Sequence, residues 1–194
     1  MIWILGNGES RSSIDVDKLH SMKIGCNAIF RDFNIEKIVC VDRRMVNEAV
    51  LASKSIIYTR KDWVDQYKGF SNVFTVPDLP YNGTARHDEP FNWGSGPYAL
   101  LIGAQESNDC RMLGFDLYGI DKKVNNIYKS TQGYDNEDKR AVDPRYWIAQ
   151  MSKIFQLYSY NKFTIYNYPG WILPESWNQP NVKVDNISNI SYTV

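Results

Sequence analysis

The chain has 194 residues, 43% of them hydrophobic, and its 22 basic and 22 acidic side chains give a formal net charge of zero. This composition excludes a disordered chain, and the balanced charge gives no strong signal for binding nucleic acid or an anionic membrane surface. The length suits one domain, residues 1–194, with its own core.

Short apolar runs bounded by glycine or polar residues predict strands. They lie at residues 1–5, 22–26, 36–42, 55–59, 72–76, 110–118 and 162–167. Helical spacing of apolar residues predicts helices at residues 43–52, 61–69, 94–106 and 143–160. This alternation predicts an α/β fold, a single Rossmann-like domain with a mostly parallel sheet of about six or seven strands and helices on both faces. The tail after the last strand is expected to be irregular.

Residues 119–142 are polar and too long for an ordinary connection between a strand and a helix. We expect this segment to form a mobile lid. The three cysteines form no CxxC pair, so we expect neither a disulfide framework nor a metal site. No apolar run approaches the length of about 18 residues that a membrane helix needs, and no leader pattern opens the chain. We therefore expect a cytoplasmic protein without a membrane span.

Two glycine-containing loops follow predicted strands or precede predicted helices. The first, "GNGES", leaves the first strand, and its glycines Gly6 and Gly8 have no Cβ to keep a ligand away from the backbone. The second, "GSGPYALLIG", opens a helix with Ser95 and Gly96. Free amides at a helix start favour an anion such as phosphate, although a tight turn without a ligand would use the same residues.

Polar side chains follow several other predicted strands. Asn27 follows the second strand, Asp42 the third, and Asp116 lies in the "GFD" end of a later strand. Each also suits a helix cap or a turn, but ligands of open α/β sheets bind beyond the carboxyl ends of strands. Their shared placement therefore predicts a binding site.

The ordered motifs "ILGNGES", "IGCNAIF", "GSGPYALLIGA" and "MLGFDLYG" resemble those of the bacterial sialyltransferases of glycosyltransferase family 42. The MptE-like and motility-accessory-factor proteins share the Gly-Asn-Gly-x-Ser start in a looser form, and small proteins of tailed phages are also similar. The resemblance covers about two-thirds of the chain by order of motifs. It implies a nucleotide-sugar site, with the nucleotide held by Gly6, Asn7, Gly8, Ser10, Asn27, Ser95, Gly96, Gly114 and Asp116.

In that family a pair of tyrosines helps the departing phosphate. Tyr118 matches the first by motif, and Tyr128 is the candidate for the second, although its spacing differs. The family carries a general-base histidine before the late helix, whereas this chain reads "KRAVDPRYW" there. The remaining candidates for a base are His87, the neighbouring Asp88, and Asp143, which also suits a helix N-cap.

These patterns predict an enzyme similar to glycosyltransferases. It would bind a nucleotide sugar, for example a CMP-linked one, and transfer the sugar to an unknown acceptor without a required metal. A non-catalytic nucleotide-binding or assembly module is the alternative from another class. Under either hypothesis a second copy of the chain, in a homo-oligomer, is a candidate partner. A weaker alternative is a nucleotide pyrophosphate hydrolase or transferase that uses Mg²⁺ with Asp42 and Asp116.

Overall fold

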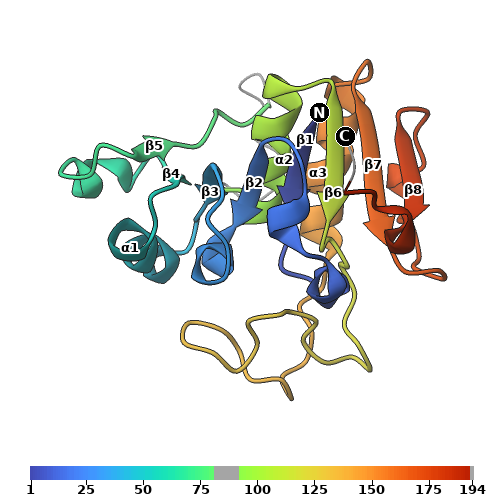
Figure 1. Ribbon diagram of the computed structural model, residues 1–194, viewed down its shortest axis with the longest axis horizontal. Helices are drawn as coiled ribbons and strands as arrows, with labels where there is room; N and C mark the ends of the chain where they lie inside the picture. The colour runs from blue at the N-terminus through green and yellow to red at the C-terminus, as the bar shows by residue number, and fades with distance from the viewer. Residues whose placement is uncertain (81–91, 193–194) are drawn as a thin grey trace.

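The computed structural model describes residues 1–80 and 92–192, and within these ranges eight strands form one sheet (Figure 1). The strands are β1 (Ile2–Leu5), β2 (Lys23–Cys26), β3 (Lys37–Val39), β4 (Ile56–Thr59), β5 (Val73–Thr75), β6 (Asp109–Leu113), β7 (Lys162–Asn167) and β8 (Val182–Asn186). All of their pairings are parallel. The predicted Rossmann-like α/β fold is therefore confirmed.

The strand order is β5-β4-β3-β2-β1-β6-β7-β8. The chain starts in the middle of the sheet, moves outward from β1 to β5, returns to β6 beside β1, and then moves outward on the other side. The four residues of β1 are all apolar and fully buried, as expected of a strand covered on both faces. The reversal between β1 and β6 is the position at which ligands bind in sheets of this type.

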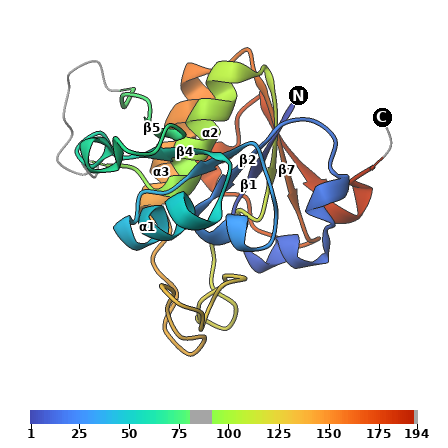
Figure 2. The same cartoon turned by 60° about the vertical axis from the view of Figure 1, so that its left-hand side comes forward.

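The two faces of the sheet have separate apolar cores. The helices α2 (Ser95–Glu106) and α3 (Arg145–Leu157) cover one face and pack against Ile4, Met112 and their neighbours. The helix α1 (Arg43–Ala52) and short 3-10 helices cover the other face, where their apolar residues belong to the same core as Trp3 and Leu5. Figure 2 shows α1 on the opposite side of the sheet from α2 and α3.

The sheet has one strand more than predicted. The additional strand is β8, in the tail that was expected to be irregular. It is an edge strand with only five residues, so its alternating Val-Lys-Val pattern is short, and the prolines before it obscure the pattern further. The predicted strand at 110–118 ends at Leu113, because Gly114 takes a φ of +75° and turns the chain out of the sheet.

Two predicted helices also differ from the structure. The helix expected at residues 61–69 is a 3-10 turn, Val64–Tyr67. The late helix begins at Arg145, so Pro144 takes the N-cap position predicted for Asp143. The carboxylate of Asp143 still accepts a hydrogen bond from the Arg145 amide, at 3.0 Å.

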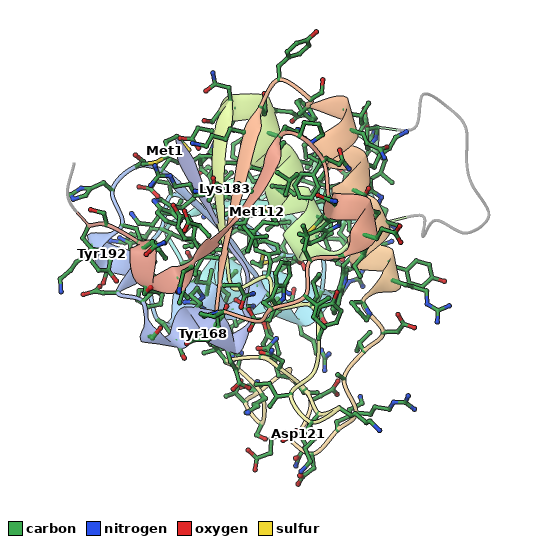
Figure 3. The ribbon with its side chains drawn as sticks, turned by 90° about the vertical axis from the view of Figure 1, so that its right-hand side faces the viewer. Met1, Met112, Asp121, Tyr168, Lys183 and Tyr192 are labelled. Carbon is green, nitrogen blue, oxygen red and sulfur yellow. The ribbon has the colours of Figure 1, made fainter. Side chains whose placement is uncertain are left out.

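Residues 119–142 leave the sheet at the carboxyl end of β6 and project beyond it (Figure 1). Figure 3 places Asp121 at the far end of this projection. The segment contains no helix. A hydrogen bond joins it to the loop after β1, because the Ile127 amide donates to the Asn7 carbonyl oxygen, at 2.8 Å.

Candidate functional site

A cavity of about 270 Å³ lies where the strand order reverses, at the carboxyl ends of β1 and β6. The loops after β1, β2 and β6, the start of α2, the first turns of α3 and the 119–142 segment surround it. Most of the predicted site residues line it. They are Gly6, Asn7, Gly8, Asn27, Ser95, Gly96, Gly114, Asp116 and Tyr118.

The glycines of the first loop pack against the loop after β6. The Gly8 amide donates to the Gly114 carbonyl oxygen, at 2.9 Å, and a Cβ on Gly6 would collide with that same oxygen. A Cβ on Gly8 would meet the carboxylate of Asp116. The space beside Gly8 is thus filled by protein, so the contact between the two loops is by itself a reason for glycine at these positions.

Asp116 also engages the polar groups that were expected to hold a phosphate. Its carboxylate accepts hydrogen bonds from the Ser10 amide, at 2.8 Å, and from the Ser10 hydroxyl. The next amide, that of Glu9, donates to Asn125 Oδ1 at 2.8 Å. Ser10 is buried and does not line the cavity, and the predicted helix after the loop is a 3-10 turn of five residues, Glu9–Ser13. The first loop therefore offers no helix N-terminus to an anion.

The side chain of Asn7 has an unused acceptor. Its Nδ2 donates to the Cys26 carbonyl oxygen, at 3.1 Å, and to the Tyr134 hydroxyl, at 3.3 Å. Its Oδ1 is buried and has no hydrogen-bond partner among the described residues. Buried polar atoms are nearly always paired, so an unpaired one beside a cavity indicates that a ligand or a water donates to it.

The start of α2 is the helix N-terminus that faces the cavity. This helix has 12 residues, and its N-cap residue, Gly94, supplies no side-chain hydrogen bond. The amides of Ser95 and Gly96 lie in the first turn, where a helix has no acceptor of its own for them. The Ser95 hydroxyl donates to Asn27 Oδ1, at 2.8 Å, which fixes the loop after β2 against this helix start. An anion in the cavity would be favoured here.

Three residues that line the cavity take a positive φ: Asn27 (+47°), Gly114 (+75°) and Leu117 (+64°). A positive φ costs free energy for the two residues that have a side chain, most of all for leucine. Such conformations gather at binding and catalytic sites, because they aim groups that a relaxed backbone would not.

An aromatic wall forms much of the cavity, from Phe115, Tyr118, Tyr134 and Trp147. Burial raises the pKa of both Tyr118 and Tyr134, so both hydroxyls stay protonated at neutral pH. The Tyr134 oxygen accepts hydrogen bonds from Asn7 Nδ2 and from the Ala28 amide, at 3.3 Å each. No described residue accepts the proton of either hydroxyl, so both remain available to a ligand.

Tyr128 does not line the cavity, although it was the candidate for the second tyrosine of the pair. It is buried, donates its hydroxyl to Asp32 at 2.6 Å, and accepts from Arg11 at 3.4 Å. Tyr134 is in the cavity instead. The 119–142 segment has no periodicity in its sequence from which to choose between the two tyrosines.

Two other predicted residues, Asp42 and Asp143, lie outside the cavity. Asp42 caps α1 by accepting from the Arg44 amide, at 2.9 Å, and does not line the cavity. Asp143 does not line it either, and its ion pair with Arg145 lowers the pKa of its carboxyl group, so it is a poor base. His87 lies outside the described residues, as does Asp88.

The cavity carries acidic but no basic side chains among the described residues. Asp116 and Asp135 line it, and Asp135 is paired with Lys139 at 2.6 Å. The described part of the chain contains no group of three or more His, Cys, Asp or Glu side chains that would hold a metal ion. Asp42 and Asp116, the pair expected for Mg²⁺, therefore do not form part of such a group.

Comparison with protein-family models, with curated proteins and with solved structures gives no match to this chain. Over residues 1–80 and 92–192, no helix is long and apolar enough to span a membrane. The chemistry of the cavity is therefore the basis on which a function is proposed.

Proposed function

We propose that the cavity binds a nucleotide sugar and that the protein is a glycosyltransferase-like enzyme. The observation that carries this proposal is the cavity at the β1–β6 reversal, which combines the α2 N-terminus with the unpaired Asn7 Oδ1. The helix start suits a phosphate, and the Asn7 oxygen suits a donor on a ribose or a base.

The charges of the cavity favour a donor with a single phosphate. Two carboxylates and no described Lys, Arg or His line it, so a diphosphate would meet repulsion with only one helix N-terminus to offset it. A phosphodiester, as in a CMP-linked sugar, carries one negative charge. We therefore place CMP-linked sugars ahead of UDP- or GDP-linked ones.

In the proposed reaction, the bond between the anomeric carbon and the phosphate oxygen breaks, and the electron pair leaves with the nucleotide. A bond to the acceptor oxygen forms, and the acceptor proton passes to a base. Tyr118 and Tyr134 would donate hydrogen bonds to the phosphate as its charge develops. His87 is the candidate base, and His87→Ala should lower turnover about 100- to 10,000-fold with the affinity for the donor nearly unchanged.

A non-catalytic nucleotide-binding module is the second candidate. It is favoured by the state of the acidic groups in the cavity: Asp116 is held by Ser10, and Asp135 is paired with Lys139. A protein that binds CMP and a CMP-linked sugar but transfers nothing to a wide set of acceptors would be such a module.

Calorimetric titration with CMP, CMP-linked, UDP-linked and GDP-linked sugars tests the proposal. CMP compounds should bind more tightly than the others, and a bound ligand at about 100 times its Kd should stabilise the fold by about 2.7 kcal/mol. Asn7→Ala should weaken binding at least about tenfold, since it removes a hydrogen bond in a buried site. Asn178→Ala is the matched control, because this asparagine is exposed and does not line the cavity. Absence of any nucleotide binding to the parent protein would refute the proposal.

A further inference from the structure

The mouth of the cavity carries an exposed aromatic side chain. Trp147, near the start of α3, lines the cavity and yet is 36% exposed. Val142, just before the helix, also lines the cavity and is 58% exposed. A large ring that is half in a cavity and half in solvent presents a flat apolar surface to an incoming molecule.

The Trp147 ring packs against the start of α2. A Cβ on Gly94 would lie only 3.0 Å from Trp147 Nε1, so the glycine lets the indole ring rest against the start of α2. A hydrogen bond joins the start of α2 to α3 here, since the Gly94 amide donates to Gln150 Oε1 at 3.3 Å. The Nε1–H itself has no acceptor among the described residues. Trp147 therefore offers a ring that packs against α2 and an N–H group that has no acceptor among the described residues.

We infer that Trp147, together with Val142, forms a stacking platform for a pyranose ring of a saccharide acceptor. One face of a pyranose ring carries C–H groups that pack on the face of an aromatic ring. The charged residues close to Trp147 in sequence, Asp143 and Arg145, are paired with each other, which suits a neutral molecule.

This inference rests on the proposed function for the role of the saccharide as acceptor. The platform continues directly into the cavity that would hold the donor, since both of its residues line that cavity. A sugar on Trp147 would therefore lie at the open side of a bound nucleotide sugar. The binding of a saccharide to Trp147 can be tested without the nucleotide.

Saturation-transfer NMR with the methyl pyranosides of glucose, galactose, mannose and N-acetylglucosamine tests the inference. At least one of them should bind the parent protein. Trp147→Ala should weaken that binding at least about tenfold, equivalent to about 1.4 kcal/mol, whereas Trp147→Phe should keep part of it because a ring remains. Tyr146→Ala is the matched control, because Tyr146 is the neighbouring aromatic residue, is 51% exposed and does not line the cavity.

Calorimetry with CMP separates this inference from the proposed function. We expect Tyr146→Ala, whose side chain lies outside the cavity, to bind CMP as the parent does. Binding of a glycoside without binding of any nucleotide would refute the nucleotide-sugar proposal and leave the platform standing. Failure of all four glycosides to bind the parent, or equal binding to Trp147→Ala, would overturn the platform. A loss of glycoside binding in Tyr146→Ala as large as that in Trp147→Ala would also overturn it, since the binding would then not depend on the residue that lines the cavity.

Discussion

Asp116 and Ser10, 106 positions apart in the chain, form one buried hydrogen-bonded unit. The carboxylate accepts from both the amide and the hydroxyl of Ser10, and both residues are at least nine-tenths buried. This unit joins the loop after β1 to the loop after β6 at the wall of the cavity. The two loops that would hold a ligand are therefore positioned by each other.

We expect Asp116→Ala to lower the free energy of unfolding by about 1–3 kcal/mol, because it leaves the buried amide and hydroxyl of Ser10 without an acceptor. Ser10→Ala should cost less, since the amide hydrogen bond remains. In urea unfolding, the double variant should differ from the sum of the single variants by about 0.5–3 kcal/mol. Simple additivity would contradict the coupling of the two loops.

A substitution at Gly8 should act on the fold before it acts on any ligand. Gly8 has an ordinary φ of −63°, so the backbone would accept another residue there and only the lack of space opposes a side chain. A Cβ on Gly8 would lie 2.6 Å from Oδ2 of Asp116. We expect Gly8→Ala to destabilise by about 1–3 kcal/mol, and Gly8→Val by more. Gly69→Ala is the control, because nothing lies within 4 Å of a Cβ at that position. Equal stability of the two alanine variants would show that Asp116 moves away without cost.

The sequence predicted the order of strands and helices well, because buried parallel strands read as short apolar runs and α1, α2 and α3 have helical spacing or clear start signals. It also placed most of the cavity, since strand ends in an open parallel sheet converge by topology alone. It did not show how the polar groups are used. Whether Ser10 faces a ligand or Asp116, and whether Tyr128 or Tyr134 enters the cavity, depends on contacts between residues about a hundred positions apart, which no local pattern records.

The cysteines should be unreactive in the folded protein. Cys26 lines the cavity but is only 4% exposed, and burial raises the pKa of its thiol to about 12. Burial also raises the pKa of Cys110 to about 12 and that of Cys40 above its usual range. Because the thiolate is the reactive form, alkylation by iodoacetamide at pH 8 should be slow in buffer and rapid in urea. Rapid labelling of Cys26 in buffer would indicate that the cavity opens widely.

The same thiols predict a loss of stability at high pH. In the unfolded chain a thiol ionises near pH 8.5, whereas in the fold Cys26 and Cys110 keep their protons to about pH 12. Their contribution is therefore complete below about pH 8.5 and is lost as the pH rises toward 12, because the unfolded state gives up its protons first. The free energy of unfolding should fall less steeply above pH 9 in a variant with alanine at all three cysteines than in the parent. Parallel curves would show that the thiols do not contribute.

Arg31 fastens the 119–142 segment to the body of the protein. Its guanidinium group forms a two-point ion pair with Glu48 and also donates to Thr131 Oγ1, at 3.0 Å, and to the Gln132 carbonyl oxygen, at 2.8 Å. It lies over the rings of Tyr128 and Tyr134, at 6.0 and 5.9 Å from their centroids. These contacts hold the part of the segment that brings Tyr134 into the cavity, so they oppose the opening of a lid.

Arg31→Ala should therefore speed amide hydrogen exchange in residues 119–142 about fivefold to a hundredfold, which corresponds to a loss of about 1–3 kcal/mol against local opening. A bound nucleotide should slow amide exchange in residues 119–142 of the parent, because a lid closes over its ligand and opens less often while the ligand is bound. Lys18→Ala is the matched control, because it removes an exposed ion pair, with Asp15, from another part of the chain. If exchange in the segment is equally slow in Arg31→Ala and in the parent, other contacts hold the segment. If a bound nucleotide also leaves the exchange unchanged, residues 119–142 are a fixed wall of the cavity and not a lid.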